Sequence, residues 1–118
     1  EFINMGHEPM MVVDEKFNFE YVKSTLPPMG LMSVKEESFF KTTTMDISDK
    51  TILIYTDGVT EGYVDEGKEL EVIGLENEIK KLNTTSPETI ITHATKILTE
   101  KGYTLRDDIT ALGIKIIN

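Results

Sequence analysis

The sequence predicts an α+β domain in which antiparallel strands are covered by two helices. Short apolar runs rich in β-prone residues occupy the first half of the chain, at 10–13, 19–22 and 52–55. A helical apolar stripe dominates the second half, at 90–98, and one further apolar run, at 111–117, closes the chain. Strands first and helices later, with one closing strand, are typical of α+β domains with mostly antiparallel pairing.

The length and composition indicate one domain, residues 1–118, with a modest core. The absence of cysteine excludes disulfides and thiolate metal sites, and it fits a reducing, cytoplasmic compartment. No apolar run approaches the roughly 20 residues of a membrane span. The net charge of −9 disfavours binding to nucleic acid and to anionic membranes.

The first half of the chain is expected to form strands joined by turns. Residues 1–4 look like a strand, and a polar turn joins the runs at 10–13 and 19–22 into a hairpin. Pro27 and Pro28 make the next segment a rigid connector, because they fix φ and remove two donors. Residues 38–45, rich in Phe and Thr, are predicted to form another strand.

The second half is expected to contain a polar loop at 62–68 and two helices. The first helix, 75–82, follows Gly74 as its cap and carries an apolar face. The second helix has Ser86 as N-cap and Pro87 at its first position, and its stop is at Lys101 and Gly102. Its apolar stripe consists of Ile90, Ile91, Ala94, Ile97 and Leu98.

Carboxylates follow one buried strand and precede another. The run at 52–55 stops on Thr56-Asp57-Gly58, which predicts a tight turn that points Asp57 out of the sheet. Asp107 and Asp108 stand just before the last strand. If these strands pair antiparallel, the end of the first lies beside the start of the second, so Asp57 and Asp107 converge on one cleft. The simpler interpretation is an exposed Asp in an ordinary turn.

Oxygen ligands of this kind suit Mg²⁺ or Mn²⁺, and a two-ion site can activate water for attack on a phosphoryl group. Other interpretations of the sequence fail. A calcium loop starting at Asp57 would have Val59 and Lys68 at ligand positions, and Asn83 is a glycosylation sequon without a secretory signal. No cysteine nucleophile or Gly-rich phosphate loop is present, and His7 and His93 are expected to be structural.

Four short motifs, at 4–9, 28–31, 52–61 and 107–110, occur in the order and at about the spacing of a known family. The chain resembles the C-terminal part of a bacterial protein phosphatase 2C-like domain, in the branch of sporulation stage II E and RsbU. The resemblance covers essentially all of residues 1–118. Met5 stands where the family usually has Ala.

The resemblance implies part of an α-β-β-α sandwich and a metal-dependent serine/threonine phosphatase that holds two Mn²⁺ or Mg²⁺ ions in the complete domain. Asp57 and Asp107 match catalytic, metal-ligating aspartates, and Asp108 is a further candidate ligand. The remaining motif residues are expected to shape turns: Gly6, His7, Gly58, Thr60 and Glu61.

The family's first half, with an Asp-Val-x-Gly-His-Gly segment that supplies further metal ligands, has no counterpart in this chain. We therefore expect the parent domain to dephosphorylate phosphoserine or phosphothreonine in a bacterial regulatory protein, such as an anti-sigma-factor antagonist, and the fragment alone to be inactive. The alternative is a non-catalytic partner-binding or remnant domain with no metal centre. An unpaired sheet edge would favour a dimer.

Overall fold

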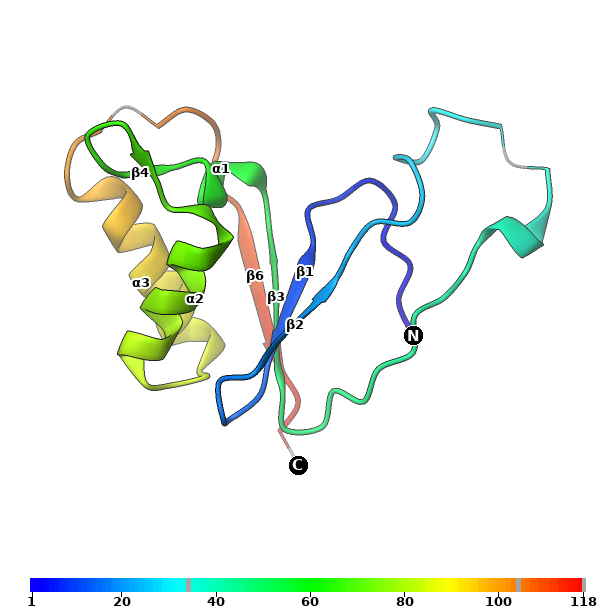
Figure 1. The fold of residues 1–118 in the computed structure, drawn as a ribbon, viewed down its shortest axis with the longest axis horizontal. Coiled ribbons are helices and arrows are strands. Elements are labelled where there is room, and N and C mark those ends of the chain that lie inside the picture. Colours follow the sequence, from blue (N-terminus) through cyan, green and yellow to red (C-terminus); the bar gives the residue numbers. More distant parts are fainter. Residues whose placement is uncertain (34, 104, 118) are drawn as a thin grey trace.

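The computed structural model describes residues 1–33, 35–103 and 105–117 and has the predicted α+β fold (Figure 1). Its main sheet is antiparallel throughout, with strand order β2-β1-β3-β6. The four strands are β1 (Met10–Val13), β2 (Phe19–Val22), β3 (Thr51–Tyr55) and β6 (Ala111–Lys115). A small hairpin is made of β4 (Tyr63–Asp65) and β5 (Lys68–Glu69). The helices are η1 (Glu37–Phe39, 3-10), α1 (Asp57–Thr60), α2 (Glu71–Leu82) and α3 (Pro87–Thr99).

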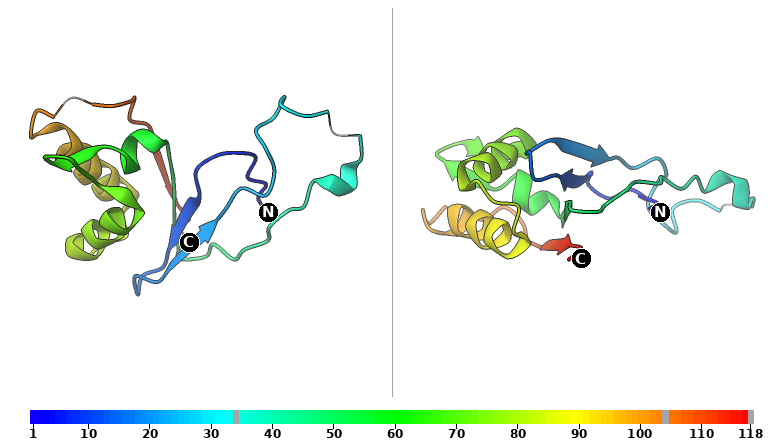
Figure 2. Two further views of the ribbon diagram at one scale, coloured as in Figure 1. Left: turned by 45° about the horizontal axis from the view of Figure 1, so that its top comes forward. Right: turned by 90° about the horizontal axis from the view of Figure 1, so that it is seen from below.

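The two long helices, α2 and α3, lie side by side on one face of the sheet, as the apolar stripes predict (Figure 2). Burial of these stripes against the strands is what keeps short helices stable in water. The core between the two layers is formed by Met11, Leu53 and Tyr55 from the sheet together with Val59, Leu70, Leu75, Ile79, Ile90, Ala94 and Leu98.

The opposite face of the sheet carries a second, smaller apolar cluster. Its buried members come from three strands: Met10, Val12, Val22 and Ile52. Partly buried side chains from the N-terminal segment and from the loop before β3 pack on it: Phe2, Met45 and Ile47. Strand β3 is therefore covered on both faces, which explains its unbroken apolar sequence.

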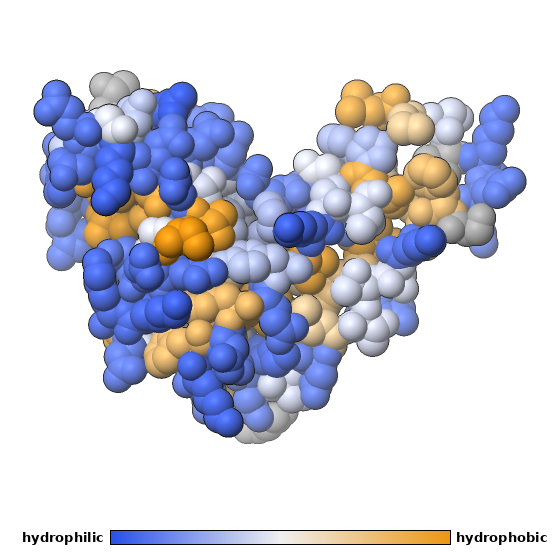
Figure 3. Space-filling model, in the orientation of Figure 1, coloured by the Kyte–Doolittle hydropathy of each residue, from blue (hydrophilic) through white to orange (hydrophobic). Residues whose placement is uncertain are grey.

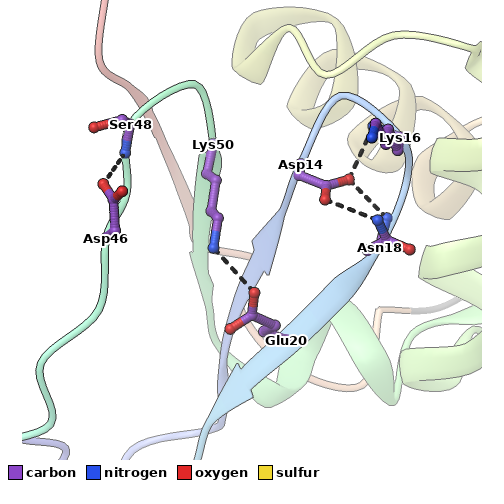
Figure 4. Close-up of polar contacts among 7 residues, drawn as sticks. All are labelled: Asp14, Lys16, Asn18, Glu20, Asp46, Ser48 and Lys50. Carbon is purple, nitrogen blue, oxygen red and sulfur yellow. Dashed lines mark hydrogen bonds and ion pairs between the residues drawn. The ribbon is translucent and has the colours of Figure 1, made fainter.

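The hairpin predicted between β1 and β2 is confirmed (Figure 4). Oδ1 of Asp14 accepts hydrogen bonds from the N–H groups of Lys16 (2.8 Å) and Asn18 (2.9 Å). These bonds close the polar turn and hold Phe17 at a φ of 61°. Lys50, the residue before β3, forms an ion pair with Glu20 of β2 (3.0 Å).

The N-cap of α3 is also confirmed. The Ser86 Oγ accepts a hydrogen bond from the Thr89 N–H (3.4 Å), and Pro87 occupies the first helical position. The helix ends at Thr99, and Gly102 follows with a φ of +67°.

Two strand predictions are wrong. Residues 38–45 form no strand; the described part of this segment holds η1 and a single bridge between Thr43 and Phe2. Within the described residues, the predicted strand at 1–4 has this same isolated bridge and one further backbone hydrogen bond, from the Thr25 N–H to the Asn4 carbonyl (3.4 Å). The part of 38–45 next to η1 extends away from the sheet in Figure 1, so its β-prone residues lack a neighbouring strand to pair with, and of the described side chains of 38–45 only Met45 reaches the apolar cluster on the sheet.

Three boundaries also differ from the prediction. The predicted loop at 62–68 contains the β4–β5 hairpin, which turns at Glu66 and Gly67. Helix α2 begins at Glu71, so Gly74 lies inside it and does not cap it. Strand β6 ends at Lys115, two residues before the end of the predicted strand, because its pairing with β3 ends at Thr51.

Polar residues cover much of the helical layer, whereas apolar side chains are exposed on the segment that extends away from the sheet (Figure 3). The exposed apolar residues of this segment are Met29, Leu31, Met32, Phe39 and Phe40. None of the helices in the described ranges has the length and apolar character needed to cross a bilayer.

The Glu78 side chain links α2 to α3. Its contacts predict a contribution to the free energy of unfolding that depends on pH. Its carboxylate contacts His93 Nε2 (2.8 Å) and Lys81 Nζ (2.5 Å), and hydrogen bonds from His93 and then from Lys81 lower its pKa from 4.5. A carboxylate with a depressed folded-state pKa stabilises the fold above its ordinary pKa and loses that effect as the pH falls through the folded-state value.

Glu78→Gln should therefore lower the free energy of unfolding by about 1 kcal/mol near neutral pH, and by progressively less below pH 4.5. Urea titrations at a series of pH values measure this difference. Glu66→Gln, at an exposed position with no ion pair among the described residues, is the control. If the difference in the free energy of unfolding between Glu78→Gln and the parent chain stayed the same in acid, the proposed role of the Glu78 carboxylate would be contradicted.

Candidate functional site

The two aspartate segments meet at one end of the main sheet. Strand β3 ends where β6 begins, because Tyr55 pairs with Ala111 in the antiparallel register. Strand β1 starts at this same end, since Met11 pairs with Leu53. Helix α1 and the segment leading into β6 lie together there (Figure 1). The predicted antiparallel pairing of β3 and β6 is confirmed.

Thr56 joins the two segments beyond the last strand pair. Its N–H donates to the Thr110 carbonyl (3.0 Å), and its hydroxyl lies 3.2 Å from the Asp108 carbonyl and 3.1 Å from the Thr110 N. The sequence interpretation gave Thr56 no role. A threonine directly before an Asp-Gly pair was the available signal, because its hydroxyl can both donate to and accept from backbone groups.

The chain turns at Asp57, as predicted: the Val59 N–H donates to the Thr56 carbonyl (3.0 Å), and the turn continues as the single helical turn α1. The Glu61 N–H and the Thr60 hydroxyl both donate to the Asp57 carbonyl, at 2.8 and 3.3 Å. Thr60 is buried within this turn, whereas Asp57 and Glu61 are exposed. The Asp57 side chain is thus on the surface, while its backbone is held by α1.

Gly58 is the closest point of approach between the two segments. A Cβ atom at this position would lie 2.2 Å from the carbonyl oxygen of Asp108 and 3.4 Å from that of Asp107. Both neighbours are backbone atoms, so neither can move aside as a flexible side chain would. Only glycine fits here without displacing α1 or the segment that carries Asp107 and Asp108.

Asp107 and Asp108 are exposed in the turn before β6. The Asp108 N–H donates to Oδ1 of Asp107 (2.7 Å), so one carboxylate oxygen of Asp107 helps to shape the turn. Arg106 reaches in another direction: it bonds the Glu69 carboxylate and lies 5.4 Å from the ring centre of Tyr63. The guanidinium is therefore anchored on the β4–β5 hairpin.

These residues do not make up a metal centre by themselves. Across residues 1–33, 35–103 and 105–117, no group of three or more His, Cys, Asp or Glu side chains is placed to hold a metal ion. Mg²⁺ keeps most of its waters unless several oxygen ligands replace them, and two ions need more ligands still. The described side chains therefore do not fit a two-ion centre without further donors.

Gly6 and His7 form the turn before β1. Gly6 has a φ of +73°, and a Cβ there would lie 2.3 Å from Cδ of Pro28. The His7 N–H donates to Oδ1 of Asn4 (3.0 Å), and its ring Nδ1 lies 3.1 Å from the Glu8 carbonyl. The turn thus packs against the Pro-Pro connector, and the ring of His7 is exposed.

Tyr55, the last residue of β3, is a buried polar group that the sequence analysis missed. It is 3% exposed, and its hydroxyl has no hydrogen-bond partner among the described residues. Burial, together with the nearby carboxylates of Glu8 and Glu76, raises the pKa of Tyr55 to about 12. Tyr21 differs, because its hydroxyl donates to the Glu76 carboxylate.

The two tyrosines give opposite expected results when the hydroxyl is removed. Tyr55→Phe should leave the free energy of unfolding unchanged or raise it by up to about 1 kcal/mol, because an unpaired buried hydroxyl is costly. Tyr21→Phe should lower it by about 1–2 kcal/mol, because a hydrogen bond to a carboxylate is lost. Urea denaturation compares the two variants. A large loss in Tyr55→Phe would mean that its hydroxyl is bonded in solution.

The antiparallel sheet, the helices on one of its faces and the two aspartate segments at its end are together consistent with part of a protein phosphatase 2C-like domain. A family model described as Stage II sporulation protein E (SpoIIE) matches residues 1–117. The chain therefore belongs to the SpoIIE family, a family of protein phosphatase 2C-like phosphatases. No significant match was found among curated proteins or among solved structures.

Proposed function

We propose that the chain is the C-terminal part of a metal-dependent serine/threonine phosphatase domain. The parent domain would hydrolyse phosphoserine or phosphothreonine in a bacterial regulatory protein, with an anti-sigma-factor antagonist as the expected substrate class. The observation that carries the proposal is the packing of Gly58 and Thr56 against residues 108–110, which holds the Asp57 and Asp107 segments together.

In this proposal, Asp57 and Asp107 are the ligands that the chain contributes to a Mn²⁺ or Mg²⁺ centre, and Asp108 is a further candidate. The remaining ligands come from elsewhere in the parent domain. Two facts support this division: the aspartates are exposed at one end of the sheet, and the described residues contain no complete metal-binding group. Carboxylates that are exposed in this chain are available as oxygen ligands for a hard cation when the rest of the parent domain is present.

Exposed apolar residues support the presence of further structure around this chain. Leu112 and Ile114 of β6 are 52% and 42% exposed on the sheet, and Met29 and Leu31 are 83% and 72% exposed on the extended segment. Apolar groups gathered in this way usually mark contact surfaces.

The outer edge of β6 is unpaired in the four-stranded sheet. An edge of this kind presents free backbone donors and acceptors to another strand. The exposed edge of β6 can therefore pair either with a strand from the rest of the parent domain or with the same edge of a second copy of the chain. Sedimentation of the purified chain distinguishes these cases, since only the second gives a concentration-dependent dimer.

The central experiment compares the 118-residue chain with a longer protein that extends upstream in the parent gene. Each is assayed with excess Mn²⁺ on a phosphoserine peptide, and Mn²⁺ binding is followed by calorimetry. We expect the longer protein to turn over only with metal. The chain alone should show no turnover and weak or absent metal binding, because a sparse shell of carboxylates cannot replace the hydration of the ion.

Two results would count against the proposal. A longer protein that is folded but inactive with both Mn²⁺ and Mg²⁺ would favour the non-catalytic, partner-binding alternative. Turnover by the chain alone that disappears in Asp57→Asn would show that the chain completes its own metal centre, for example as a dimer.

A further inference from the structure

A pocket of about 340 Å³ lies between the β4–β5 hairpin, the middle of α2 and the C-terminal end of α3. Its volume is within the range of small-molecule sites. Its apolar lining side chains are those of Val64, Leu70 and Ile97. Its polar and charged lining side chains are those of Lys68, Asn77, Glu78, Lys81, Glu100 and Lys101. None of these residues belongs to the aspartate segments.

The acidic residues of the pocket already have cationic partners. Glu78 contacts both Lys81 (2.5 Å) and His93 (2.8 Å). Glu100 forms an ion pair with Lys96 on α3 (3.5 Å). Their negative charges are therefore largely balanced by groups of the helices themselves.

Two of the three lysines have no such balance. The Lys101 ammonium donates to the Val64 carbonyl (2.9 Å), a neutral acceptor, and Lys68 makes no ion pair within the described residues. Asp65 attracts both ammonium groups from beyond ion-pair distance, and its Oδ1 accepts from the Tyr103 hydroxyl (3.1 Å). The pocket thus offers two ammonium groups that form no ion pair within the described residues, next to apolar side chains, in a chain of net charge −9.

We propose that this pocket binds a small organic anion, in which a phosphate-like or carboxylate group meets Lys68 and Lys101 and an apolar body covers Val64, Leu70 and Ile97. The two ammonium groups provide charge-assisted hydrogen bonds, and Asn77 adds a neutral donor at the α2 side. The proposal goes beyond the phosphatase function and does not depend on it, because no aspartate of the candidate metal site takes part.

The pocket also has a structural link to the candidate site. The Leu70 N–H donates to the Gly62 carbonyl (2.8 Å), and Gly62 lies two residues after the end of α1. A ligand on Leu70 therefore contacts the hairpin that continues from the Asp57 turn. Occupancy is expected to shift the amide signals of the hairpin first and those of α1 to a smaller extent.

The test uses the full chain, labelled with ¹⁵N, and three probes: phenylphosphonate, benzoate and benzyl alcohol. Phenylphosphonate cannot be hydrolysed as a phosphate ester, and EDTA is added so that no metal at the aspartates can recruit it. We expect saturable shifts of the amides of Lys68, Asn77 and Lys101 with at least one of the two anions. Benzyl alcohol, which has a similar body but no charge, should bind at least about fivefold more weakly.

The decisive variant is the double substitution Lys68→Gln/Lys101→Gln, which should weaken anion binding by at least about fivefold. The matched control is Lys23→Gln/Lys41→Gln, which makes the same charge change at exposed positions outside the pocket. This control should change the affinity for the anion by less than about twofold. A well-dispersed spectrum verifies that each variant is folded. The proposal is overturned if neither anion shifts the pocket amides, if benzyl alcohol binds equally well, or if the control variant loses as much affinity.

Discussion

Gly58→Ala should lower the free energy of unfolding by about 2 kcal/mol or more, because the new methyl group would overlap backbone atoms. Its Cβ would lie 2.2 Å from the Asp108 carbonyl oxygen. To relieve the overlap, α1 must move away from the segment before β6. We therefore expect the backbone amides of Asp57, Asp107 and Asp108 to show the largest chemical-shift changes, together with a lower urea midpoint.

Gly74→Ala is the matched control for this substitution. Gly74 lies within α2, and its nearest contact would be Cδ1 of Leu70 at 3.1 Å, the flexible end of a side chain. Because alanine favours a helix interior by up to about 1 kcal/mol over glycine, this variant should be as stable as the parent chain or more stable. Equal stability of the two variants would falsify the close-packing argument for Gly58.

Asp57→Asn and Asp107→Asn should each lower kcat/KM of the complete phosphatase domain by more than about 100-fold. Loss of a ligand is expected to exceed the roughly 10–100-fold cost of removing an outer partner of a ligand. Asparagine keeps the size of the side chain but removes the charge that a hard cation requires. Both aspartates are exposed, so the melting temperature of the metal-free protein should hardly change.

Asp108→Asn discriminates between the two neighbouring aspartates. The structure shows the Asp108 backbone bonded to Thr56 and to Asp107, and these contacts do not use the Asp108 carboxylate. We expect this variant to retain substantially more activity than Asp107→Asn. An equally severe loss would mean that the ligand assignment within this pair is wrong, and calorimetric Mn²⁺ titrations of the three variants would show which carboxylate binds.

The secondary structure could be predicted where the local pattern and the tertiary environment agree. Ser86 and Pro87 start a helix through their own side chains, and the apolar stripe that follows needs only some apolar surface to cover it. The Asp14 turn is similarly local, since Asp14 bonds residues two and four positions away. The strand predicted at 38–45 failed because a strand requires a partner, and the part of this segment next to η1 extends away from the sheet.

Part of the candidate site was likewise predictable. Asp57 and Asp107 were expected at one sheet end because each adjoins an apolar run, and antiparallel pairing of β3 with β6 places those ends together. The contacts that fasten the two segments were not predictable in this way. Thr56 and Gly58 are adjacent in sequence to Asp57, but their partners lie about 50 residues further along the chain.

The sequence by itself determined the four strands of the main sheet, the two long helices, the α+β class and the motifs that the chain shares with the SpoIIE family, since all of these depend on residues close together in the chain. Only the tertiary structure decided that α1 is a helical turn, that Tyr55 buries an unpaired hydroxyl and that Lys68 and Lys101 line one pocket. These features depend on packing between segments that are distant in the sequence. Local propensity does not determine which of these distant segments come into contact.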